Sequence, residues 1–153
     1  MNKLVSNVKK TLVWNSSKIY TINYLVLLFS SFVYGIYILV LKLSKNINFE
    51  SLLKSNPYTS IMFVVILLNL LVGYILWMNS NINKQHYDNK VFLLLGICQL
   101  LIGNIFSFIT FISTFFVLKN SEGKIIKKNL TTLFLSTLLY LICFILLLRM
   151  VIK

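Results

Sequence analysis

Long apolar runs separated by short basic connectors make up most of the chain. Between successive basic side chains lie four uncharged stretches of 23, 29, 28 and 20 residues. A helix that crosses a bilayer needs about 20 predominantly apolar residues, and each stretch meets this length. The pattern therefore predicts four transmembrane helices, near residues 22–43, 57–78, 91–118 and 130–151.

The order of residues within these runs favours helices over the strands of a transmembrane barrel. Barrel strands alternate polar and apolar residues over about 10 positions, and these runs do not alternate. The dipeptide Asn56–Pro57 predicts a helix start, because asparagine caps helix N-termini and proline fits the first helical position. We therefore predict an all-α integral membrane protein in the form of a four-transmembrane-helix bundle.

The N-terminal segment shows an amphipathic pattern rather than a secretory signal. Lysines interrupt any apolar core that a signal peptide would need, while Leu4, Val8 and Leu12 gather on one helical face. This pattern is typical of a helix that lies in the headgroup plane. We predict such an interfacial helix over residues 1–20, with a disordered basic tail as the alternative. The lysines expected to contact anionic headgroups are Lys3, Lys9, Lys10 and Lys18.

Composition supports a membrane protein and excludes two other classes. Hydrophobic residues make up 58% of the chain and charged residues only 12%, about half the share of a soluble domain. Disorder requires low hydrophobicity, so a disordered chain is excluded as well. The 153 residues suffice for a single membrane domain. Alanine is absent while lysine, asparagine and isoleucine are abundant, which indicates the A/T-rich codons of a low-GC bacterium.

The net charge of +12 comes from lysines that punctuate apolar runs. A nucleic-acid-binding protein would gather its basic residues into a patch with stacking aromatics, so we expect no nucleic-acid partner. Anionic lipid headgroups are the simpler partner for the basic excess. Four spans would place both termini on one side, with eight basic residues there against seven on the other. Because the flank before the first span is the more basic one, we predict a multi-pass cell-membrane protein with both termini cytoplasmic.

Polar and small residues within the predicted spans gather on single helical faces. In the third span six of them recur at offsets of 3 or 4 residues, the period of one helix face. Small residues let helices approach closely, and amides and hydroxyls can hydrogen-bond across the contact. The predicted helix-packing or partner face consists of Asn69, Gly73, Gly96, Gln99, Gly103, Asn104, Ser107, Thr110, Ser136 and Tyr140. A polar permeation path or ligand site along the same residues is the alternative.

Three amides, Asn69, Gln99 and Asn104, lie deep within predicted spans. An unpaired amide in hydrocarbon costs several kcal/mol, so we expect these side chains to pair with each other or with hydroxyls. The two cysteines, Cys98 and Cys143, lie in apolar runs and lack a CxxC motif. We expect them to be buried free thiols at similar depth, because four consecutive spans would run antiparallel.

Several kinds of site are missing from the sequence. The three acids, Glu50, Asp88 and Glu122, all lie in connectors, which argues against proton coupling through a buried carboxylate. One histidine cannot assemble a usual catalytic metal site, and no nucleotide-binding glycine motif occurs. We therefore predict neither enzymatic activity nor a metal or other cofactor.

Two functional hypotheses fit what remains. The first is a non-enzymatic accessory, assembly or immunity-type subunit that binds another membrane protein, or a second copy of itself, through helix faces. In size and lysine content the chain resembles the small immunity proteins of pore-forming bacteriocins, without sharing a motif with them. The second is a small oligomeric transporter or channel for a neutral solute or an ion, with the three amides lining the path. The lack of an intramembrane charge favours the first hypothesis.

Overall fold

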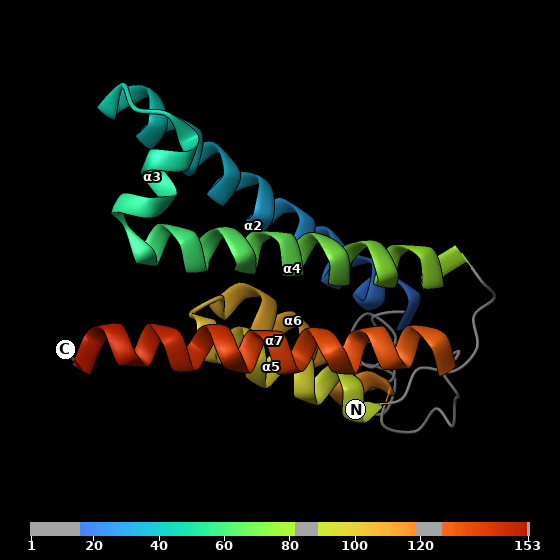
Figure 1. Cartoon of the computed structure of the whole chain (residues 1–153). Helices are drawn as coiled ribbons and strands as arrows, with labels where there is room; N and C mark the ends of the chain where they lie inside the picture. Colours follow the sequence, from blue (N-terminus) through green and yellow to red (C-terminus); the bar gives the residue numbers. More distant parts are fainter. Residues whose placement is uncertain (1–15, 82–88, 119–126, 153) are drawn as a thin grey trace, which may run out of the picture.

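The computed structural model describes residues 16–81, 89–118 and 127–152, and these residues are helical apart from short turns. Within them the chain forms six helices (Figure 1). They are α2 (Ser16–Lys45), α3 (Phe49–Ser55), α4 (Pro57–Asn81), α5 (Asn89–Ile102), α6 (Ile105–Leu118) and α7 (Lys127–Ile152). The prediction of an all-α protein is confirmed. Three of the described helices, α2, α4 and α7, are long and apolar enough to cross a membrane.

The corner between α2 and α4 follows local sequence signals. Helix α2 ends before Asn46, whose positive φ of 49° is a conformation that asparagine tolerates better than most residues. Helix α4 begins at Pro57, and Asn56 Oδ1 accepts a hydrogen bond from the backbone N–H of Tyr58 at 3.0 Å. The helix start expected at Asn56–Pro57 is therefore confirmed.

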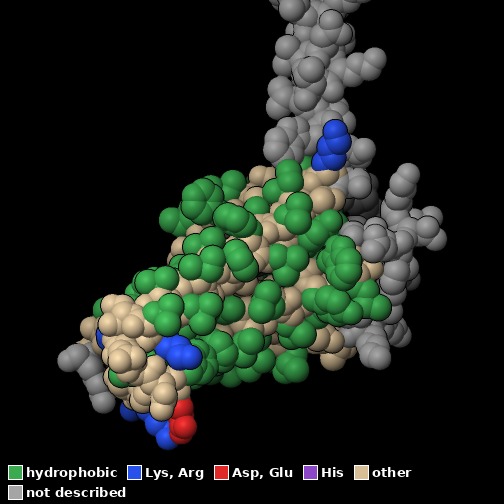
Figure 2. All heavy atoms as spheres, turned by 90° about the horizontal axis from the view of Figure 1, so that it is seen from above, with side chains coloured by type: hydrophobic (Ala, Val, Ile, Leu, Met, Phe, Trp, Pro, Cys, Tyr) green, Lys and Arg blue, Asp and Glu red, His purple; other side chains and the backbone are tan. Residues whose placement is uncertain are grey.

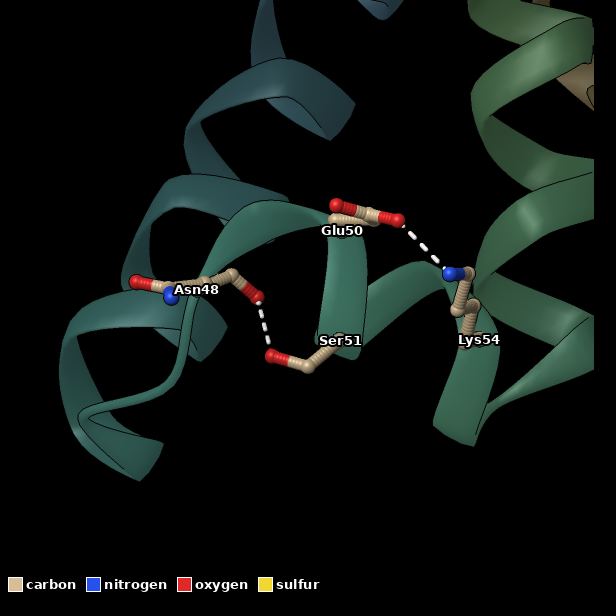
Figure 3. A network of polar contacts seen from close by, with 4 residues as sticks. All are labelled: Asn48, Glu50, Ser51 and Lys54. Atoms are coloured by element: carbon tan, nitrogen blue, oxygen red, sulfur yellow. Dashed lines mark hydrogen bonds and ion pairs between the residues drawn. The ribbon is translucent and has the colours of Figure 1, made fainter.

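Helix α3 is short and lies across the end of the α2–α4 pair (Figure 1). Its buried Leu52 packs with Ile38 of α2 and Ile66 of α4, which fixes α3 against both long helices. On its outer side Lys54 and Glu50 form an ion pair at 2.6 Å, and the Ser51 hydroxyl donates to the Asn48 carbonyl at 2.7 Å (Figure 3). Both charged side chains are largely exposed, so the pair contributes little to stability.

The prediction of one continuous helix over residues 91–118 is wrong. The chain stops being helical at Gly103 and Asn104 and turns back, so that α5 and α6 form a hairpin (Figure 1). Gly103 has a φ of +89°, and its N–H donates to the Leu100 carbonyl while the Asn104 N–H donates to the Gln99 carbonyl. These two bonds form the glycine-based motif that ends many helices. Asn104 then caps the start of α6, because its Oδ1 accepts from the Ser107 N–H at 3.3 Å.

The predicted count of four spans is not confirmed, for the same reason. Each arm of the hairpin has 14 residues, which at 1.5 Å per residue extend about 21 Å. The hydrocarbon core of a bilayer is about 30 Å thick, so neither arm is long enough to cross it. In place of a third span the structure has two short apolar helices, and the described residues contain three candidate spans.

Five helices pack in a closed ring around the interior of the molecule. Each packs most extensively against two neighbours, in the order α2, α4, α7, α5, α6 and back to α2. The core of this ring is built from large apolar side chains of all five helices, including Leu27, Val72, Phe92, Phe111 and Leu133. Helix α3 stands outside the ring and contacts α4.

The two ends of the bundle can be told apart by their contacts. At one end, named here the α3 end, the last turns of α7 lie beside α3 and the start of α4. At the other end the Tyr20 hydroxyl of α2 donates to the Leu76 carbonyl of α4 at 2.6 Å, and Tyr20 stacks edge-on against Phe92 of α5. The start of α2 and the end of α7 therefore lie at opposite ends (Figure 1). The prediction that both termini share one side requires an even number of crossings, which the described helices do not confirm.

Most of the predicted interfacial helix lies outside the described residues, including Lys3, Lys9 and Lys10. Its last five residues, 16–20, belong instead to α2, which continues without a break from Ser16 to Lys45. Lys18 is exposed, whereas Tyr20 is buried. An interfacial helix over residues 1–15 lies outside the described residues and stays a prediction.

Candidate functional site

A hydrogen-bonded network of uncharged side chains occupies the interior of the helix ring. At its centre Asn69 of α4 accepts two hydrogen bonds through Oδ1. One comes from Gln99 Nε2 of α5 at 2.9 Å and the other from the Tyr140 hydroxyl of α7 at 2.6 Å. All three side chains are at most 1% exposed. A single carbonyl oxygen thus joins three helices far apart in sequence.

Asn104 extends this network from the hairpin turn to α2. Its Nδ2 donates to Gln99 Oε1 at 3.0 Å and to the Ser30 hydroxyl at 3.3 Å. The same side chain caps α6, so one residue ends the turn and connects it to two neighbouring helices. The expectation that the three amides pair with each other or with hydroxyls is confirmed by these bonds.

A second polar contact joins α2 to the far end of α6. Asn23 Nδ2 donates to Thr114 Oγ1, and Thr114 in turn donates to the Thr110 carbonyl at 2.9 Å. Among the described residues, neither Asn23 Oδ1 nor Ser107 Oγ finds a hydrogen-bond partner, although both atoms are buried. These two atoms are where ordered water would be most favourable.

The glycines of the predicted packing face lie at close helix contacts or at the turn. A Cβ added to Gly73 would come within 3.1 Å of Leu28 on α2, and one added to Gly96 within 3.3 Å of Phe111 on α6. Gly103, in contrast, ends α5, and a Cβ added there would meet no atom within 4 Å. Its role is conformational, since its positive φ disfavours other residues.

The remaining residues of that face make bonds within their own helices. The Thr110 hydroxyl donates to the Ser107 carbonyl at 2.9 Å, and the Ser136 hydroxyl donates to the Thr132 carbonyl at 2.9 Å. Ser136 is fully buried. The structure thus brings Asn69, Gln99, Asn104 and Tyr140 into one network, and the hydroxyl residues line the ring beside it.

The prediction that the thiols of Cys98 and Cys143 lie at equal depth is wrong. Helices α5 and α7 both start at the end opposite α3 and therefore run in the same direction (Figure 1). Cys98 lies level with Thr137, whose carbonyl is 3.9 Å from its sulfur, and Cys143 comes six residues later on α7. Both cysteines are free and buried, as the sequence predicts.

The exterior of the molecule is apolar. Figure 2 shows hydrophobic side chains over most of the visible face, with charged side chains gathered toward the ends. The side chains of Asn69, Gln99 and Tyr140 are buried and bonded within the network, so they offer no polar surface to a partner, whereas Asn104 is only partly buried. Among the described residues, no three histidine, cysteine or acidic side chains lie together as metal ligands would. The chemistry of the site is hydrogen bonding without charge.

The turn of the hairpin exposes irregular backbone on this otherwise apolar exterior. Gly103 is exposed, and the first residues of α6 project outward, with Ile105 58% and Phe106 78% exposed. The carbonyls of Leu101 and Ile102, in the last turn of α5, receive no backbone hydrogen bond from the part of the chain that the structure describes. The hairpin therefore places irregular backbone, with two carbonyls that lack a backbone donor, about 21 Å along the bundle from its starting end.

The sequence contains a signal for this turn, because glycine commonly ends a helix and asparagine commonly caps the start of the next one. Comparison with known protein families, with curated protein sequences and with solved structures finds no match. The geometry of the network and of the hairpin turn is therefore the basis for assigning a function.

Proposed function

We propose that this chain is a non-enzymatic cell-membrane protein that binds another membrane protein through its outward-facing helix surfaces. The observation that carries this proposal is the exposed hairpin turn. Irregular backbone at membrane depth is stable only where protein or water covers it, because hydrocarbon cannot hydrogen-bond to free carbonyls. A partner segment seated on the turn beside Phe106 would supply both the cover and an apolar contact.

The proposed arrangement in the bilayer has three crossings and one re-entrant hairpin. Helices α2, α4 and α7 cross, while α5 and α6 enter from the side where α4 ends and return to it. On this reading ten basic residues belong to the side where α2 begins and five to the α3 side. The positive-inside rule then places the start of α2 in the cytoplasm and the end of α7 outside. The even balance of eight to seven came from counting the hairpin as a crossing.

A transporter or channel is the second candidate, and the interruption between α5 and α6 favours it. Helices interrupted by glycine near the membrane centre often form the binding sites of transporters. In this chain, however, the amides that would line a path are bonded to one another inside the ring, and Asn69, Gln99 and Tyr140 are almost completely buried. This candidate requires water, rather than a partner, at the hairpin turn.

Site-specific photo-cross-linking in native membranes tests the choice. A benzophenone amino acid replaces Phe106 at the turn, and the matched control replaces Phe116, which is 65% exposed near the other end of α6. We expect one stoichiometric cross-link to another membrane protein from position 106 and none to that protein from position 116. Equal cross-linking from both positions would contradict a partner site at the turn.

A thiol-labelling experiment complements the cross-linking. In the variant Phe106→Cys, with Cys98 and Cys143 replaced by alanine, a partner at the turn should protect the new thiol from a charged methanethiosulfonate reagent. Rapid modification in native membranes would show that water reaches the turn. That result, together with no cross-link at position 106, would favour the transporter or channel over the binding protein.

A further inference from the structure

A groove at the α3 end separates the last turns of α7 from the corner between α3 and α4. Its volume is about 520 Å³, within the range of small-molecule sites. The apolar lining includes Leu53, Ile61, Leu146 and Met150, and two basic side chains, Lys54 and Arg149, complete it. It lies outside the polar network and away from the hairpin turn.

The two basic side chains differ in how far they are already paired. Lys54 is held by Glu50 at 2.6 Å, which uses one of the three donors of its ammonium group (Figure 3). Arg149 is exposed and forms no ion pair with any described residue. The hydroxyl of Ser60 in the groove already donates to the Leu53 carbonyl at 2.6 Å. The free donors of the groove are therefore mainly those of the guanidinium group.

The charged and apolar parts of the groove are arranged along the axis of the bundle. Lys54 is in the last turn of α3, and Arg149 is in the last turn of α7, so both lie at the end of the bundle. Ile61 lies one turn further into α4 than Pro57, and Leu146 lies three residues before Arg149. In the three-crossing arrangement of the proposed function, the basic groups therefore stand at headgroup level and the apolar walls extend toward the membrane interior.

We propose that this groove is a binding site for an anionic phospholipid, with its phosphate between Arg149 and Lys54 and an acyl chain along the apolar walls. A planar guanidinium group can bind phosphate oxygens through two parallel hydrogen bonds. Basic pockets between transmembrane helices are known to bind anionic headgroups. A free phosphate ion would leave the apolar walls uncovered, and a zwitterionic lipid would lack the net negative charge that the two basic groups favour.

Lipid retention by the purified full-length chain tests this site. The chain is reconstituted in nanodiscs that contain phosphatidylglycerol and phosphatidylcholine, and the bound lipids are counted by native mass spectrometry. We expect preferential retention of phosphatidylglycerol by the wild type. The double variant Lys54→Gln, Arg149→Gln should bind it about tenfold more weakly, because each basic group near the surface contributes roughly fivefold and Glu50 offsets part of Lys54.

Two matched controls separate a specific site from general attraction. The variant Lys42→Gln, Lys45→Gln removes the same charge from the last turn of α2 at the same end, outside the groove, and should change retention less than about twofold. Leu146→Trp fills the groove without changing charge and should also weaken binding. Leu148→Trp, on the same helix and equally exposed at 43%, should not.

Three results would overturn the proposal. Equal losses from the two double variants would mean diffuse attraction of anionic lipids to the α3 end. Equal retention of phosphatidylglycerol and phosphatidylcholine by the wild type would mean that the basic groups select nothing. Displacement of the lipid by inorganic phosphate at the same concentration would mean a simple anion site, in which the apolar walls play no part.

Discussion

Replacing Asn69 by leucine is expected to lower the free energy of unfolding by about 3 kcal/mol, since a buried donor left without its acceptor costs about 1–3 kcal/mol. Asn69 Oδ1 is the acceptor for both Gln99 Nε2 and the Tyr140 hydroxyl, and leucine offers neither of them a replacement. All three side chains are almost fully buried, so water cannot take over the lost bonds. Reversible unfolding by sodium dodecyl sulfate in mixed micelles, followed by circular dichroism, measures the change.

Two tyrosine variants serve as controls for this experiment. Tyr140→Phe removes one hydroxyl from the network and should cost about 1 kcal/mol. Tyr74→Phe makes the same change at an exposed position of α4 and should cost less than about 0.5 kcal/mol. In the Asn69→Leu background, Tyr140→Phe should no longer destabilise, because its hydroxyl has already lost the acceptor. Additive effects of the two substitutions would contradict the shared network.

Replacing Gly103 by alanine is expected to destabilise the protein by about 1–2 kcal/mol, because a residue with a Cβ disfavours a positive φ. The φ of Gly103 is +89°, and no atom lies within 4 Å of the added Cβ, so the cost comes from the backbone alone. Thermal unfolding in detergent, monitored by circular dichroism, gives the measurement.

Gly35 offers a matched control with the opposite expected sign. It lies in the middle of α2, and an added Cβ there also meets nothing within 4 Å. Alanine at this position should stabilise the protein by about 0.5–1 kcal/mol, as in other helix interiors. If residues 91–118 formed one continuous helix, alanine would stabilise at position 103 as well. Stabilisation by Gly103→Ala would therefore contradict the hairpin.

The long helices and the pairing of the amides could be predicted from the sequence. The helices depend on local hydropathy, and the pairing depends on the large cost of leaving an amide without a hydrogen bond. Apolar runs between lysines define α2, α4 and α7, and Asn56–Pro57 sets the start of α4 within one residue. Pairing of Asn69, Gln99 and Asn104 follows from the cost of an unsatisfied amide in an apolar interior. The choice of partner for each amide depends on how the helices of the ring pack. The pattern of polar residues on one helix face does not predict it.

The hairpin was missed because hydropathy does not change across it. Residues on both sides of Gly103 and Asn104 are apolar, so a search for uncharged runs joins the two arms into one span. The helical period also continues by coincidence, since Gln99, Gly103 and Ser107 remain four residues apart through the turn. The wrong depth of the thiols follows from this one turn, and so do the unconfirmed span count and the unconfirmed shared side of the termini.

In the proposed arrangement, α5 and α6 enter and leave the membrane on the same side, and cysteine accessibility tests this directly. Cys98 and Cys143 are first replaced by alanine, and single cysteines are then introduced as Ser51→Cys, Gln85→Cys and Gly123→Cys. Each variant is labelled with a membrane-impermeant maleimide, once in intact cells and once in inverted vesicles. We predict that the thiols at positions 85 and 123 react only from the cytoplasmic side, and the thiol at position 51 only from the outside. Reaction of position 123 from the same side as position 51 would mean that the segment between α4 and α7 crosses the bilayer, and would contradict the account.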